Sequence, residues 1–91
     1  MDDREKITAA GNTFVPVVNT LRSLGYSVRR EGTDPEIWWA ENAELSVSAE
    51  DPHHLLALVT MRQVQGTDWQ ASDREIEATL REFYGDEHTG A

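Results

Sequence analysis

The chain has 91 residues, no cysteine, and a formal net charge of −9 from 17 acidic and 8 basic side chains. This length supports one hydrophobic core, because two cores of half the size would each bury too little apolar surface to fold. We therefore predict a single domain over residues 1–91. The lack of cysteine excludes disulfide bonds and thiolate metal sites. The negative charge disfavours binding to nucleic acid or to an anionic membrane, and it favours a cationic partner.

Both ends of the chain are polar, and we predict flexible tails at residues 1–11 and 86–91. The N-terminal segment MDDREKITAAGN lacks the apolar core of a signal peptide, and no apolar run reaches transmembrane length. A cytoplasmic protein is the expectation.

A first helix is predicted to begin at Asn12 or Thr13 and to end at Gly25, with Tyr26 covering its end. Its apolar residues recur at the i, i+3, i+4, i+7 spacing of one buried face. They are Phe14, Val17, Val18, Leu21 and Leu24.

Three short runs of period two follow, at residues 26–30, 37–40 and 45–49, and turn-forming residues separate them. Because the connections are short, we predict an antiparallel meander of three strands. One assignment of faces points Val28, Ile37, Trp39, Leu45 and Val47 towards the helices. Alternation then places Ser27, Arg29, Glu36, Trp38, Ala40, Glu44, Ser46 and Ser48 on the opposite face. Two alternatives stay open: a register with Trp38 inside and Trp39 outside, or an N-terminal tail folded over Trp38.

The most apolar stretch of the chain runs from Asp51 to Gly66 and is predicted to form a central helix over residues 52–64. Asp51 is suited to cap the helix, Pro52 to its first position, and Gly66 to a left-handed end. A buried strand over residues 55–61 is the alternative, because short apolar runs are ambiguous by periodicity.

The final segment contains Trp69, which we expect to fill the end of the core where two helices meet. A last helix is predicted from Ser72, with Glu75 completing a capping box and Gly85 ending the helix. Its buried stripe would be Ile76, Leu80 and Phe83. The fold class is therefore α+β: a small two-layer domain of order α-β-β-β-α-α, with helices on one face of the sheet.

No catalytic, metal or cofactor site is predicted. The sequence has no glycine-rich phosphate loop or nucleophile motif, and His53 and His54 stand beside Asp51 at the start of a helix. Adjacent helical residues point roughly 100° apart, so the two histidines do not readily share one ion. Only Arg22, Arg29 and Arg30 approach a basic stripe. Against a charge of −9, three arginines are too few for nucleic-acid binding.

The middle of the chain is strongly acidic. Residues 31–51 contain no Lys or Arg and hold Glu31, Asp34, Glu36, Glu41, Glu44, Glu50 and Asp51. A tryptophan on such a face is a plausible interface anchor, because Trp dominates binding energy when a partner buries it. We therefore predict a partner-binding site at Glu36, Trp38, Glu41 and Glu44.

In size, charge and this base-free block, the chain resembles the broad set of small acidic bacterial proteins that includes toxin-immunity proteins and other inhibitors. The resemblance implies a non-catalytic inhibitor of a basic protein such as a nuclease-type toxin. The alternative is an accessory or homo-oligomerising domain in which Trp38 meets its own copy across a two-fold axis. A small enzyme is the third hypothesis. Monomer and homodimer both stay open.

Overall fold

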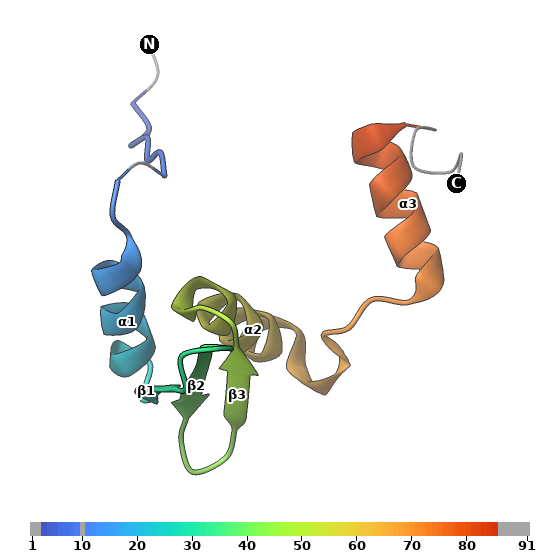
Figure 1. Cartoon of the computed structure of the whole chain (residues 1–91). Coiled ribbons are helices and arrows are strands. Elements are labelled where there is room, and N and C mark those ends of the chain that lie inside the picture. The colour runs from blue at the N-terminus through green and yellow to red at the C-terminus, as the bar shows by residue number, and fades with distance from the viewer. Residues whose placement is uncertain (1–2, 10, 86–91) are drawn as a thin grey trace. The chain divides into compact units, whose positions relative to one another are not determined.

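The computed structural model describes residues 3–9 and 11–85, and its elements follow the order α-β-β-β-α-α (Figure 1). They are α1 (Phe14–Ser23), β1 (Ser27–Glu31), β2 (Ile37–Glu41), β3 (Ser46–Ala49), α2 (Pro52–Gln65), a short 3-10 helix η1 (Gly66–Asp68) and α3 (Asp73–Tyr84). The three strands form one antiparallel sheet with β2 in the middle. The predicted α+β fold is confirmed. The tail predicted at residues 86–91 lies outside the described residues.

The chain divides into two compact units, Met1–Thr60 and Met61–Ala91, and the boundary falls within α2. The first unit holds α1, the sheet and most of α2. The second holds the end of α2, η1 and α3. One domain over residues 1–91 stays a prediction.

Helix α1 begins and ends where the sequence indicates. Its first turn is closed by a hydrogen bond from the Val17 N–H to the Thr13 carbonyl oxygen, at 3.0 Å. At the other end, Gly25 has a φ of 97°, and the Tyr26 N–H donates to the Leu21 carbonyl oxygen at 3.1 Å. This left-handed glycine and the bond across it are typical of a Schellman helix end. Tyr26 is buried and covers that end, as predicted.

The register of the sheet assigns each strand residue to a face, because directly paired residues lie on the same face. Ala40 of β2 pairs with Val28 of β1 and Val47 of β3. Trp39, one residue earlier, pairs with Arg29 and Ser48. Ala40 therefore shares the inner face with the two valines, and Trp39 lies on the outer face.

The predicted faces of β1 and β3 are confirmed. The first assignment of β2 is wrong, and the alternative register, with Trp38 inside and Trp39 outside, is the one observed. Trp38 lies on the inner face, where it is half-buried against the core, and Trp39 lies on the outer face. The physical reason is the space beneath the helices. Ala40 is fully buried at the centre of the sheet, and its small side chain lets the helices approach the backbone there. A tryptophan at that position would not fit.

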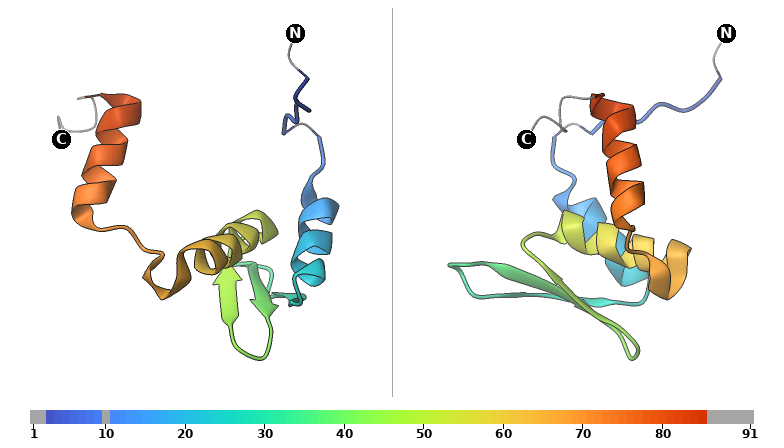
Figure 2. Two further views of the ribbon diagram at one scale, coloured as in Figure 1. Left: turned by 180° about the vertical axis from the view of Figure 1, so that it is seen from behind. Right: turned by 90° about the vertical axis from the view of Figure 1, so that its right-hand side faces the viewer.

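The core lies between the inner face and the first two helices. Its buried residues are Val17, Leu21, Tyr26, Ala40, Leu55 and Val59. Helices α1 and α2 each contribute two of these side chains, and both lie on the same side of the sheet (Figure 2). The inner face is thus covered by α1 and α2, which leaves the outer face without a helix in the first unit.

Helix α2 confirms the prediction of a central helix, and the alternative of a strand over residues 55–61 is wrong. Asp51 caps it: its Oδ1 accepts a hydrogen bond from the His54 N–H at 2.9 Å. Pro52 is the first helical residue, and Gly66 follows the last with a φ of 73°.

Protonation of Asp51 is expected to weaken the first turn of α2. The hydrogen bond from the backbone N–H of His54, supported by the His54 ring, holds the pKa of Asp51 below its ordinary value. The stabilisation from Asp51 is therefore present above the unfolded-state pKa of about 3.9 and is lost as pH falls through the lower folded value. Asp51→Asn keeps a capping oxygen but has no proton to bind. Its urea unfolding free energy should decline less than that of the wild type between about pH 5 and pH 2. Equal declines would show that other carboxylates govern acid unfolding.

Helix α3 has the predicted capping box. The Glu75 N–H donates to the Ser72 Oγ at 3.2 Å, and the Ser72 N–H donates to a Glu75 carboxylate oxygen at 2.9 Å. Within the second unit, no described residue of α3 is buried, and Ile76 and Phe83 are 46% and 72% exposed, so the burial of this stripe stays a prediction. Trp69 is half-buried in the second unit, and its role as a core plug also stays a prediction. The core cluster of the first unit draws on residues 17–59.

Candidate functional site

The outer face of the sheet is the face opposite Ala40, and it is predominantly polar around two large apolar side chains. From the register, its residues are Ser27, Arg29, Glu31, Ile37, Trp39, Glu41, Ser46 and Ser48. Among the described residues of the first unit, no helix packs on this face (Figure 2). The outer face is therefore a surface on which a central tryptophan is accessible from solvent.

Arg29 lies over the ring of Trp39, with its guanidinium carbon 4.9 Å from the ring centroid. The same guanidinium donates to Glu31 at 3.0 Å and to Glu41 at 3.1 Å. A cation held over an indole face by two carboxylates is attracted to all three groups. Arg29 and the two glutamates thus form a charged frame around Trp39.

Hydrogen bonds favour the charged forms of Arg29 and Glu41. Hydrogen bonds, first with Glu31 and then with Glu41, raise the pKa of Arg29. The hydrogen bond that Glu41 accepts from the Ser46 hydroxyl, followed by the bond from Arg29, lowers the pKa of Glu41. These groups are exposed, so each pair contributes little to stability. What these pairs provide is a fixed arrangement of charge beside Trp39.

The indole of Trp39 also carries an unpaired donor. Its Nε1 is buried, and it has no hydrogen-bond partner among the described residues. A buried donor without an acceptor costs about 1–3 kcal/mol relative to a paired one. Trp39 is therefore a position where a new acceptor would lower the free energy.

Two of the four predicted site residues lie on the helix side of the sheet. Trp38 meets Phe14 of α1 edge to face, with ring centroids 5.5 Å apart and an interplanar angle of 74°. Glu36 accepts a hydrogen bond from Arg30 at 3.1 Å, and Arg30 is the cross-strand partner of Trp38. Trp38 is thus engaged with the core and does not stand free on an acidic surface.

The other two predicted residues lie elsewhere. Glu41 belongs to the outer face, beside Trp39. Glu44 is exposed in the turn between β2 and β3, where its N–H donates to the Asn42 side chain at 2.9 Å. The structure therefore does not bring Glu36, Trp38, Glu41 and Glu44 together on one face.

Sequence reasoning missed Trp39 and Arg29 as site residues. The signal that would have found them is the turn between β2 and β3. Glu41 pairs with Ser46 across this turn, so the two share a face. A polar, outward Ser46 then requires Glu41 and Trp39 to point outward as well.

The histidines have local partners. The His54 Nδ1 lies 2.7 Å from Asp51 Oδ2, and the His53 Nε2 lies 2.7 Å from the Thr13 hydroxyl. Within residues 3–9 and 11–85, no cluster of three or more histidine or carboxylate side chains is arranged to hold a metal ion. In the same part of the chain, no helix combines the length and the apolar content needed to cross a membrane.

Comparisons with protein-family models, with curated proteins and with solved structures give no significant match to this chain.

Proposed function

We propose that this chain is a non-catalytic binding protein that recognises a basic protein through the outer face of its sheet. Its simplest biological form is an immunity-type inhibitor of a nuclease-type toxin in the bacterial cytoplasm. The observation that carries the proposal is a partly exposed Trp39 in the middle strand, on a sheet face that no described helix of the first unit covers, with Glu31 and Glu41 beside it.

Electrostatics supports a cationic partner. The chain carries a net charge of −9, and residues 31–51 hold its base-free acidic block. Such a field accelerates association with a basic protein and repels nucleic acid. An inhibitor with this charge would therefore bind a nuclease-type toxin and not the nucleic acid that the toxin cleaves. Glu31 and Glu41 both belong to this block.

Trp39 supplies the anchor. A lysine or arginine of the partner that pairs with Glu31 and Glu41 competes with Arg29 for the same carboxylates. Release of Arg29 uncovers the indole ring, and a partner acceptor can then pair with its Nε1. Burial of a tryptophan ring at the centre of an interface is a common origin of a binding hot spot.

Kinetic binding measurements test the proposal with the basic protein encoded by the adjacent gene or retained from the native cell. Trp39→Ala is expected to raise the dissociation rate, with a loss of about 2 kcal/mol or more in binding free energy. The double variant Glu31→Gln/Glu41→Gln should mainly slow association, and the slowing should shrink at high salt.

The matched control is Glu77→Gln/Glu82→Gln on α3, which removes the same charge from the second unit instead of from the sheet. It should slow association less than the sheet variant does. Equal slowing by both double variants would show that the change in association rate comes from net charge and not from the outer face. If Trp39→Ala also dissociates as the wild type does, the outer face is not the binding surface.

A further inference from the structure

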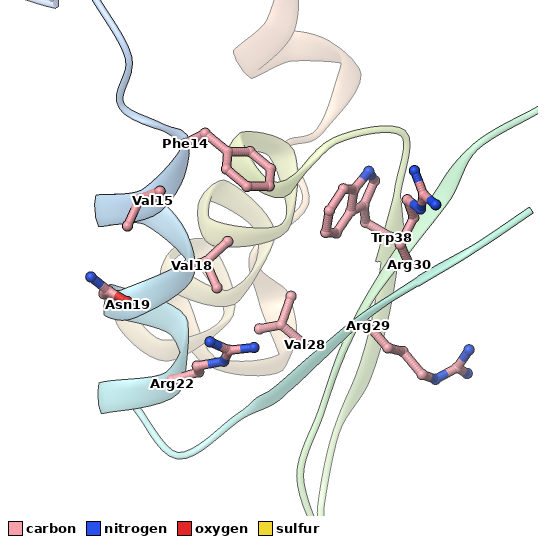
Figure 3. Close-up of a pocket in the computed structure, with 9 residues that line it drawn as sticks. All are labelled: Phe14, Val15, Val18, Asn19, Arg22, Val28, Arg29, Arg30 and Trp38. Carbon is pink, nitrogen blue, oxygen red and sulfur yellow. The ribbon is translucent and has the colours of Figure 1, made fainter. Parts of the chain in front are cut away.

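A pocket of about 290 Å³ lies between α1 and the inner face of the sheet, on the opposite side from Trp39 (Figure 3). The lining that matters for recognition is Phe14, Val18, Arg22, Val28, Arg30 and Trp38. All belong to the first unit. Pockets for small organic ligands usually range from about 300 to 1,000 Å³, so this volume suits a small ligand.

Five of the nine residues that line the pocket are apolar or aromatic. Val18 of α1 and Val28 of β1 stand on its two sides, and the rings of Phe14 and Trp38 lie at one end (Figure 3). The side chain of Phe14 stays accessible, with 39% of its surface exposed. An apolar body placed here would contact two ring systems and two branched side chains.

Arg22 gives the pocket a charge. Its guanidinium extends from α1 towards Val28 (Figure 3). Among the described residues, no side-chain hydrogen bond or ion pair involves Arg22. A cation in the last turn of a helix complements the helix dipole, and this explains why an arginine occurs at position 22. The dipole does not explain why the side chain extends across the pocket.

A second arginine of the lining, Arg30, lies on the inner face. Its guanidinium is already paired with the Glu36 carboxylate at 3.1 Å. The pocket therefore offers one guanidinium free to pair with a ligand. The Glu36 carboxylate beside Arg30 disfavours a second negative charge. The lining matches a monoanion with an apolar body better than a phosphate ester with two charges.

We propose that this pocket binds a small aromatic monocarboxylate. The carboxylate pairs with the fork of Arg22, and the ring lies between Val18 and Val28 against Trp38. This site lies on the other side of the sheet from the outer face, so it is independent of the proposed partner binding.

Titration of the ¹⁵N-labelled full chain with 4-phenylbutyrate tests the proposal by NMR, with 4-phenyl-1-butanol as the uncharged analogue. Amide shifts should be confined to the pocket lining, with Val18 and Val28 among the largest, together with the indole N–H of Trp38. The acid should bind about tenfold or more tightly than the alcohol, because only the acid forms a charge-assisted pair with Arg22.

Arg22→Gln should abolish this preference, whereas Arg74→Gln, the matched change on α3, should retain it. Trp39→Ala should leave the titration unchanged, so failure at this pocket is distinguishable from failure at the outer face. Equal binding of acid and alcohol, or a preference that survives Arg22→Gln, would overturn the proposal. Tighter binding of phenyl phosphate than of 4-phenylbutyrate would overturn the assignment to a monocarboxylate.

Discussion

Leu21→Ala is expected to destabilise the protein by about 3–5 kcal/mol. Leu21 is fully buried in α1 and belongs to the core cluster with Leu55 and Val59 of α2. Truncation removes buried methyl groups and leaves a cavity between α1 and the sheet. The same small core holds both of these elements in place. Since a domain of this size has a stability on the order of 5 kcal/mol, the variant should be largely unfolded or close to it.

Leu24→Ala is the matched control, because Leu24 follows the same helix and is 41% exposed. Its cost should be about 1 kcal/mol or less. Leu21→Met, which conserves volume, should keep the fold and cost below about 1.5 kcal/mol. Urea unfolding followed by circular dichroism compares the three variants. Similar midpoints for Leu21→Ala and Leu24→Ala would contradict the position of the core.

Trp38→Ala is expected to cost about 3 kcal/mol, and Trp69→Ala about 1 kcal/mol or less. Trp38 packs against the core cluster and meets Phe14 edge to face, so its removal opens a space between β2 and α1. Trp69 is not part of that cluster. The sequence alone predicts the reverse order, with Trp69 as the core plug.

Far-ultraviolet circular dichroism is the appropriate probe, because each substitution also removes a fluorophore. Phe14→Ala provides a second reading of the same contact, since it removes the partner ring of Trp38 from α1. It should destabilise by less than Trp38→Ala, because Phe14 is the more exposed of the two. A larger cost for Trp69→Ala than for Trp38→Ala would contradict the observed face of β2.

The charge of the candidate site was predictable from the sequence. The position of the tryptophan on the outer face was predicted one residue too early. The acidic block from 31 to 51 is visible in the sequence, and Glu41 does lie on the outer face. The tryptophan on that face is Trp39 instead of Trp38. Arg29 was predicted on the correct face, but its position over Trp39 depends on the pairing of two strands and is not visible in either strand alone.

What the sequence by itself determined is local. The start of α2 follows from Asp51 and Pro52, the start of α3 from Ser72 and Glu75, and the end of α1 from Gly25. In each case the decisive hydrogen bond or dihedral angle joins residues within a few positions of one another. Such signals act in the same way whatever the rest of the chain does.

Only the tertiary structure decided the face of β2. The run from Ile37 to Ala40 is apolar on both faces, and the flanking Glu36 and Glu41 have opposite phase, so alternation cannot choose between them. The choice falls to Ala40, which alone is small enough for the space beneath α1 and α2. The periodicity of α3 specifies an amphipathic helix, but burial of its stripe requires a partner surface, which a local pattern does not identify.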